Sequence, residues 1–301
     1  MKLFFSDLSK LIKFRLTFLV DFSASVTFLI GSRMQVARGE MPAIDWGNWW
    51  ILVAGGFLVT AAANCFNEII EKDLDKLMTR TKDRPMAAGR MTTGQGLVMG
   101  LVMGMLGTWL LGKLNLETGL LSVFSIFIYA FIYTPLKRRA PILAVFIGAI
   151  AGAFPPLIGY LAALGHIRHF FPIDYEIAII LFLVQFAWQF PHFWSIAWVL
   201  DDDYKLAGFR FLPTKKRDKG SAIVIFVSSL VLIAVSLLPT IYGFGGYYIA
   251  GVSIVAGLIF SYLAFKLVVK LDIESARRVM FCSFFYIPLV QLILLFDFIG
   301  K

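Results

Sequence analysis

The feature that most constrains this sequence is a series of nine apolar stretches, each long enough to cross a lipid bilayer. A transmembrane helix needs about 20 consecutive, mostly apolar residues. The stretches lie at residues 14–36, 46–67, 94–113, 116–135, 141–164, 174–199, 220–242, 245–269 and 279–299. They predict an all-α integral membrane protein with nine transmembrane helices, embedded in the lipid bilayer.

The composition excludes several other classes of protein. Apolar residues make up 59% of the 301-residue chain and charged residues only 16%, whereas soluble domains have about 45–50% and about 25%. A soluble enzyme, a disordered chain and a nucleic-acid-binding domain are therefore excluded. Cys65 and Cys282 form neither a disulfide framework nor a zinc-binding pattern. The first apolar stretch is too long for a cleavable signal peptide and lacks a cleavage site.

The distribution of basic residues predicts the orientation of the chain. Of the 28 lysines and arginines, 23 lie in the N-terminal segment and in the regions that follow the second, fourth, sixth and eighth stretches. The other five are Arg33, Arg38, Lys113, Arg168 and Lys301. Because basic residues concentrate on the cytoplasmic side, we expect a cytoplasmic N-terminus and a C-terminus outside.

Two of the cytoplasmic loops, at residues 68–91 and 201–219, contain acidic as well as basic residues. Each has six lysines and arginines, and together they hold nine of the 19 acidic residues. Orientation alone requires basic residues and gains little from acidic ones. The mixture indicates a site that holds a metal ion and an anion together.

The first acidic loop continues a helical column of polar residues. Asn64, Asn67, Glu71 and Asp75 are spaced by three, four and four residues, so they share one face of a helix. Such a column is typical of a magnesium site, because Mg²⁺ prefers oxygen ligands and is often shared with substrate phosphates. The alternative is a solvated helix end, but polar groups within a membrane are costly unless they have a function.

Basic residues near this column are candidates for holding a diphosphate. Arg80 and Arg84 follow shortly after Asp75, and guanidinium groups bind phosphate oxygens in a bidentate manner. Lys72, between the acidic residues, is a further candidate.

The second acidic loop begins with Asp201, Asp202 and Asp203 at the end of an apolar stretch. Consecutive helical residues point about 100° apart, so the three carboxylates cannot all face one ion. We expect one or two of them to bind metal, with Asp202 and Asp203 as the candidates, while the others contact Lys205 or Arg210. Lys205 is also a candidate for contacting diphosphate. A charged helix end is the alternative. Two such patches suit the ionisation of an allylic diphosphate, whose carbocation needs a dry, aromatic cavity.

Several motifs resemble the UbiA-type intramembrane prenyltransferases, and within them the protoheme IX farnesyltransferase (heme O synthase) branch. The resemblance covers residues 10–220. The motifs are Asn64-Cys-Phe-Asn67 through Arg80-Thr-Lys-Asp-Arg84-Pro85, Tyr133-Thr-Pro-Leu-Lys137-Arg138, Gly152-Ala-Phe-Pro155-Pro156, Gln189-Phe-Pro191-His192-Phe-Trp194 and Asp202-Asp203-Tyr204-Lys205.

The resemblance implies a single transmembrane prenyltransferase domain over residues 1–301, built as nine helices around a central cavity. It implies farnesyl diphosphate and heme B (protoheme IX) as substrates, heme O as product and Mg²⁺ as cofactor. Asn67, Glu71, Asp75, Asp202 and Asp203 would be the catalytic metal ligands. The expected location is the cell inner membrane with the active site on the cytoplasmic side, and contact with heme A synthase or terminal oxidase assembly factors is a further expectation.

The heme-binding residues expected from the resemblance are His192, Trp194, Tyr133 and Arg138. His192 is either a heme ligand or catalytic base, or a histidine hydrogen-bonded to a neighbouring helix. The chain departs from the family pattern at Glu68 and Glu71, where aspartate is common. We also expect Asp21, inside the first stretch, to form an ion pair with Arg15.

Two other functions stay open from the sequence. A prenyltransferase of this type could accept an aromatic quinone precursor such as 4-hydroxybenzoate in place of heme. A cation-coupled transporter would also have charged loops, but it predicts polar residues through the full depth of the bilayer. Here polar residues cluster in the cytoplasmic half.

Overall fold

The computed structural model describes residues 2–165 and 172–299, and the regular secondary structure of these residues is helical apart from one isolated β-bridge between Gly245 and Phe298. Nine helical segments within them are long and apolar enough to cross a membrane. The expected all-α architecture is therefore confirmed. Arg168 and Lys301, used above for the orientation, lie outside the described residues.

The first half of the chain begins with a short helix and continues with long, apolar ones. Its elements are α1 (Lys2–Leu11), α2 (Phe14–Ala37), α3 (Trp46–Asp75), α4 (Thr93–Leu114), α5 (Leu116–Phe127), the π-helix η1 (Ile128–Tyr133), α6 (Thr134–Arg139) and α7 (Pro141–Ala163). The segment α5–η1–α6 crosses the membrane as one unit.

The second half consists of four further long helices and two short ones. They are α8 (Pro172–Val199), α9 (Asp201–Leu206), α10 (Lys219–Ser236), α11 (Leu238–Ile241), α12 (Tyr247–Lys270) and α13 (Ile273–Asp297). The last helix starts six residues before the predicted 279, because Asp272 caps it by accepting a hydrogen bond of 2.7 Å from the backbone N–H of Ser275.

Small residues allow the helices to approach one another closely. Gly96, Gly100, Gly104 and Gly107 are buried along α4, which packs against α3. A Cβ at Gly107 would lie 2.9 Å from the backbone oxygen of Gly55 on α3. Such small-residue faces are the usual packing device between helices in lipid. Large apolar side chains such as Met105 and Phe285 point outward instead, as expected for lipid contact.

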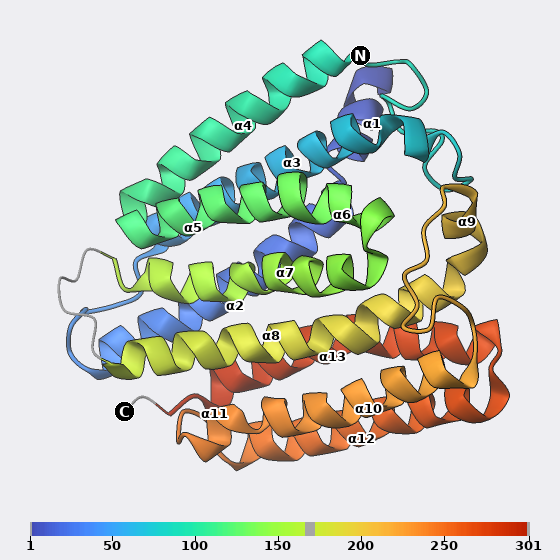
Figure 1. The fold of residues 1–301 in the computed structure, drawn as a ribbon. Coiled ribbons are helices and arrows are strands. Elements are labelled where there is room, and N and C mark those ends of the chain that lie inside the picture. The colour runs from blue at the N-terminus through green and yellow to red at the C-terminus, as the bar shows by residue number, and fades with distance from the viewer. Residues whose placement is uncertain (1, 166–171, 300–301) are drawn as a thin grey trace.

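The two acidic loops lie at the same end of the bundle. In Figure 1, α1, the loop after α3, and α9 are all at the right-hand end, although α9 follows α3 by more than 120 residues. Helix α2 packs against α3, α7 and α13, and α8 packs against α7, α10 and α13. This arrangement places a ring of α2, α7, α8 and α13 beneath the loops.

The expected ion pair between Asp21 and Arg15 is absent from the described residues. Asp21 is buried, and its Oδ1 has no hydrogen-bond partner. A Cβ added at Gly56 of α3 would come within 2.6 Å of this oxygen, so the carboxyl group lies against the α3 backbone. Arg15, in contrast, is exposed in the first turn of α2.

Candidate functional site

A pocket of about 180 Å³ opens at the end of the bundle where the two acidic loops meet. Residues from α2, α3, η1, α6, α8 and α9 line it, together with Lys13 just before α2 and the loops that follow α3 and α9. Its polar lining is Lys13, Asn67, Glu71, Asp75, Arg80, Arg84 and Lys137, and its apolar and aromatic lining is Leu16, Met78, Tyr133, Phe193, Tyr204, Phe209 and Phe211.

The acidic column lies on the last turns of α3, as its spacing predicts. Asn67 and Asp75 are 1% and 0% exposed, and Glu71 is also buried. Asn67 links the column by donating from Nδ2 to Glu71 Oε2 at 2.9 Å and to Thr134 Oγ1 at 3.0 Å. The column is therefore a rigid array of oxygen atoms facing one pocket.

Each member of this array has a cationic partner from a different part of the chain. Lys13 Nζ donates to Asn67 Oδ1 at 2.6 Å. Lys137 Nζ lies 2.7 and 2.8 Å from the two carboxylate oxygens of Glu71. Arg84 Nη1 donates to Asp75 Oδ2 at 2.6 Å. The pocket thus has three oxygen-bearing and three cationic side chains in matched pairs.

Local backbone geometry brings the two lysines to the pocket. Lys13 has a left-handed φ of 48° at the break between α1 and α2, which redirects the chain. Burial, next to the cationic Arg84 and Lys137, lowers the pKa of Lys13 to about 7. Lys137 follows η1, and its Nζ lies 4.7 Å from the ring centroid of Tyr133. A π-helical turn shifts the facing of the residues that follow it and is frequent at functional sites.

The loop after α3 is fastened to the helix that precedes it. Glu68 is fully buried and accepts a hydrogen bond of 3.1 Å from the backbone N–H of Met86. Thr81 donates from Oγ1 to the backbone oxygen of Asp75 at 3.0 Å. Arg90, farther along, donates to both carboxylate oxygens of Asp7 on α1. These contacts hold Arg80 and Arg84 at the pocket.

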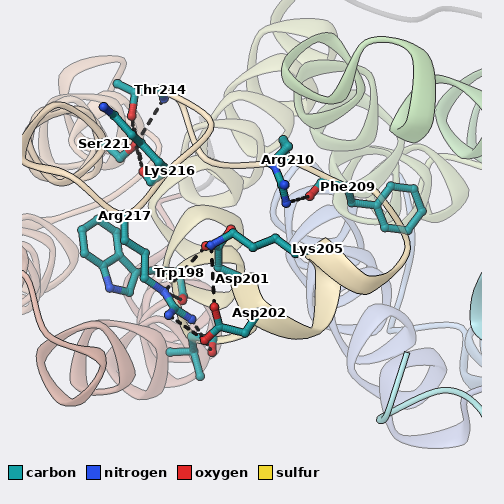
Figure 2. Close-up of polar contacts among 11 residues, drawn as sticks. Trp198, Asp201, Asp202, Lys205, Phe209, Arg210, Thr214, Lys216, Arg217 and Ser221 are labelled. Carbon is teal, nitrogen blue, oxygen red and sulfur yellow. Dashed lines mark hydrogen bonds and ion pairs between the residues drawn. The ribbon is translucent and has the colours of Figure 1, made fainter. Parts of the chain in front are cut away.

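The second acidic cluster faces a different set of partners. Asp202 accepts from Arg217 Nη1 at 2.8 Å, and its side chain is 72% exposed. Buried Asp201 pairs with Lys205. Figure 2 shows Asp201 and Asp202 pointing toward Arg217 and Lys205. The hydrogen bond from Arg217 holds the pKa of Asp202 below its usual range. None of these four side chains lines the pocket.

Asp203 is the member of this cluster that reaches the first loop. Its Oδ1 accepts a hydrogen bond of 2.6 Å from the backbone N–H of Thr79. The next residue, Tyr204, lines the pocket itself. Asp202, in contrast, does not line the pocket that Asp75 lines. Adjacent residues of α9 point in different directions, so Asp202 and Asp75 do not share one pocket, contrary to the expectation.

The sequence profile of the UbiA prenyltransferase family matches residues 24–287, which is most of the chain. The chain belongs to this family. It is therefore a prenyltransferase.

Curated relatives agree on one branch of the UbiA family. A protein named protoheme IX farnesyltransferase from Cytophaga hutchinsonii is 41% identical over 290 residues, with 96% of each chain covered. One of the same name from Christiangramia forsetii is 40% identical, with 97% of this chain and 93% of the relative covered. The branch identified from the motifs is thus confirmed.

Solved UbiA structures have the same fold at low sequence identity. One, described as digeranylgeranylglyceryl phosphate synthase, has a TM-score of 0.76 at 18% identity and covers 97% of this chain and 98% of its own. A UbiA homologue from Archaeoglobus fulgidus bound to GPP and Mg²⁺ has a TM-score of 0.67 at 14% identity, covering 96% of this chain and 99% of its own. These confirm the UbiA fold of the prenyltransferase.

Some candidate residues lie outside the pocket of this prenyltransferase. Lys72 donates to Thr93 Oγ1 at 3.1 Å, on the side of α3 that faces α4. His192 Nδ1 lies 2.7 Å from Ser283 Oγ of α13, and its ring stacks on Trp188. This contact agrees with the alternative that His192 is hydrogen-bonded to a neighbouring helix. Trp194 is buried on α8, and Arg138 is exposed after η1. Among the expected heme contacts, Tyr133 lines the pocket.

Two pocket lysines were missed by the sequence reasoning. Neither Lys13 nor Lys137 was assigned to the diphosphate site, although both contact members of the acidic column. The motif around Tyr133 was a usable signal for Lys137, because a lysine one helical turn after a pocket tyrosine faces the same way. Lys13 stands where the UbiA-type pattern has a Lys-Pro-Arg turn, here Lys13-Phe14-Arg15, but its contact with Asn67 depends on the break between α1 and α2.

The oxygen atoms of the column fit a magnesium ion. Asp75 Oδ1 is buried and has no hydrogen-bond partner, and Asn67 and Glu71 supply further oxygens beside it. Mg²⁺ usually binds one or two carboxylates and takes its remaining ligands from water and substrate phosphates. The described residues hold no ready-made cluster of three or more His, Cys, Asp or Glu side chains, so substrate oxygens would complete the coordination.

Proposed function

We propose that the protein transfers the farnesyl group of farnesyl diphosphate to a vinyl group of heme B and produces heme O. The names of its relatives support these substrates. The observation that carries the proposal is the pocket itself, in which buried oxygen atoms and cationic side chains face one another above an aromatic wall. A diphosphate with a bound cation needs both kinds of partner.

Asn67, Glu71 and Asp75 would hold Mg²⁺, and the ion when bound neutralises charge that develops on the leaving diphosphate. Lys13, Arg80, Arg84 and Lys137 would hold the diphosphate oxygens. The matched pairs described above would then separate, because each carboxylate gains the metal and each cation gains a phosphate oxygen. Once the diphosphate is bound, the metal and the cationic side chains would surround it before the bond breaks, and this arrangement stabilises a departing anion.

The role of the second cluster is less direct in this proposal. Asp203 holds the loop of Arg80 through the Thr79 backbone, and it stays a candidate metal ligand from the sequence. Asp202 and Lys205 would support α9 through their contacts with Arg217 and Asp201. Lys72 stays a candidate for diphosphate binding from the sequence alone.

Aromatic side chains form the wall of the pocket. Phe193 packs edge-to-face on Phe211, and Tyr204 packs on Phe211 as well. Aromatic faces stabilise a cation and exclude water. An allylic cation formed at the diphosphate would therefore survive long enough to be captured by the acceptor.

Bonds and charges balance over the whole reaction. The bond between farnesyl C1 and the diphosphate oxygen breaks, and the terminal carbon of the vinyl group bonds to C1. The positive charge then lies on the inner vinyl carbon, next to the porphyrin. Water adds to that carbon and loses a proton, which leaves a hydroxyl group. Tyr133 and Arg138 remain proposed heme contacts, as do Trp194 and His192.

We further propose that the protein lies in the cell inner membrane as one domain, residues 1–301, with the pocket on the cytoplasmic side. The concentration of basic residues supports a cytoplasmic N-terminus and a C-terminus outside. Contact with heme A synthase or with terminal oxidase assembly factors stays a prediction.

Mass analysis of the product tests the proposed acceptor. The purified protein is incubated with Mg²⁺, farnesyl diphosphate and either heme B or 4-hydroxybenzoate. We expect a farnesylated, hydrated heme and no farnesylated benzoate. A product formed only from 4-hydroxybenzoate would overturn the heme assignment in favour of the quinone-precursor alternative. Cation flux in liposomes without any prenylated product would favour the transporter.

A further inference from the structure

Two motifs that the diphosphate site does not use meet where α7 and α8 pack together. Gly152 belongs to one motif and Gln189 to the other. A Cβ added at Gly152 would overlap the side-chain amide of Gln189, with Nε2 as the nearest atom. The amide of Gln189 therefore lies directly on the backbone of α7, in a space that only glycine leaves open.

The register of both helices places this amide beneath the pocket. On α8, Phe193 lines the pocket, and Gln189 precedes it by one turn on the same face, about 6 Å along the axis. On α7, Gly148 lies against the ring of Tyr133, which also lines the pocket. Gly152 follows Gly148 by one turn. The register of α7 and that of α8 therefore both place Gln189 one helical turn below Tyr133 and Phe193.

The hydrogen bonding of Gln189 differs from that of the next polar layer. One turn deeper, Gln185 accepts from Gln291 Nε2 at 3.3 Å, and Gln291 also donates to Ser23 Oγ at 2.7 Å. Gln185 and Gln291 are 7% and 3% exposed. Gln189 is half-buried and forms no hydrogen bond within the described part of the chain. The amide oxygen and nitrogen of Gln189 are not fully buried, so both keep accessible surface and hydrogen-bonding capacity for a small polar molecule.

The proposed reaction requires one polar reactant in an otherwise dry chamber, the water that adds to the cation beside the porphyrin. We propose that the Gln189 amide holds this water beneath the aromatic wall, on the side of the acceptor away from the diphosphate. This inference rests on the proposed function. The water oxygen bonds to the inner vinyl carbon, and the proton released from it passes to the departed diphosphate.

Without that water, the same cation has another outcome. It loses a proton from the adjacent carbon, which was the terminal vinyl carbon, and forms an alkene. The proton again passes to diphosphate, so this product is one water lighter than heme O. The ratio of the two products therefore reports on the water and not on the rate of the transfer.

The test is the product ratio of Gln189→Leu, measured by mass spectrometry with Mg²⁺, farnesyl diphosphate and heme B. We expect the share of the dehydrated product relative to the hydrated one to rise about tenfold or more, the factor that one buried hydrogen bond is worth. Gln189→Glu keeps an oxygen acceptor and should restore the hydrated product. The control is Gln185→Leu, one turn deeper, which should leave the ratio unchanged.

Gly152→Ala provides a second variant in which the amide is present but displaced, and it should also increase the dehydrated share. If the wild type makes hydrated heme O and Gln189→Leu gives the same ratio of dehydrated to hydrated product, this inference is wrong while the proposed function stands. Equal shifts in Gln189→Leu and Gln185→Leu would also overturn it. If Gln189→Leu does not fold, Gly152→Ala with an unchanged ratio is decisive against it. Failure of the wild type to modify heme would instead refute the proposed function.

Discussion

Asp203 Oδ1 accepts a hydrogen bond of 2.6 Å from the backbone N–H of Thr79, 124 residues earlier in the chain. This contact joins the short helix α9 to the loop that carries Arg80 and Arg84. The second acidic cluster therefore acts on the pocket through the first acidic loop.

Asp203→Ala should raise the KM for farnesyl diphosphate, because the loop loses an anchor at Thr79. Asp203→Asn keeps the oxygen acceptor and should recover most of the affinity at an unchanged Mg²⁺ requirement, whereas loss of a metal ligand would raise the Mg²⁺ concentration that is needed. Steady-state kinetics of both variants checks this. Asp202→Ala, which removes the exposed neighbour, is the control with a near-normal KM. Equal damage from the alanine and asparagine variants of Asp203 would contradict loop positioning.

Asp75→Asn should lower turnover by about 10²–10³-fold, a typical cost of removing a group that stabilises developing charge. Asp75 is fully buried, and its Oδ1 is the oxygen without a hydrogen-bond partner. The protein should still be found in the membrane. The measurement is turnover per amount of membrane-embedded protein. Asp73→Asn is the matched control, since Asp73 is exposed and pairs with Lys76 outside the pocket. Retained activity in Asp75→Asn would remove Asp75 from the metal ligands.

Lys137→Met should destabilise the protein and weaken diphosphate binding together. The ammonium group is the partner of buried Glu71, and loss of one member of a buried pair costs about 3–5 kcal/mol because the other charge is left unpaired. Thermal unfolding in detergent and the KM for farnesyl diphosphate measure the two effects. Arg139→Met removes an exposed positive charge nearby and should change neither. An unaltered melting temperature in Lys137→Met would argue against the pair.

Removal of divalent metal should abolish product formation, and Mg²⁺ should restore it in a saturable manner. The reason is that the carboxylates of Glu71 and Asp75 line the pocket and carry the same sign of charge as the diphosphate, so the two repel each other unless a cation lies between them. Product formation after chelator treatment and Mg²⁺ titration provides the measurement. The Mg²⁺ concentration needed should rise in Glu71→Gln, which removes one carboxylate, and stay unchanged in Asp73→Asn. Full activity in excess chelator would refute metal dependence.

His192→Ala and Ser283→Ala should each lower the free energy of unfolding by about 1 kcal/mol, the net worth of one hydrogen bond. Their side chains are joined at 2.7 Å between α8 and α13, so the double variant should lose little more than the larger single effect. Thermal unfolding measures this, and the heme absorption spectrum of the bound acceptor should be the same in all variants. A changed spectrum in His192→Ala alone would support the heme-ligand alternative.

The sequence was sufficient for the features that depend on one helix at a time. Helix length and apolar content predicted the nine spans, and the 3.6-residue period predicted that Asn67, Glu71 and Asp75 share a face. The start of α13 was placed six residues late, because hydropathy reports where a helix meets lipid and not where its backbone hydrogen bonds begin.

The tertiary structure alone decided which side chains from different helices contact one another. Asp202 and Lys72 turned away from the pocket, toward Arg217 and Thr93, while Lys13 and Lys137 turned into it. The physical reason is that spacing along a helix sets which residues face together but not which helix stands opposite. Contacts across 54 residues, as between Lys13 and Asn67, exist only once close packing has brought distant helices to one end of the bundle.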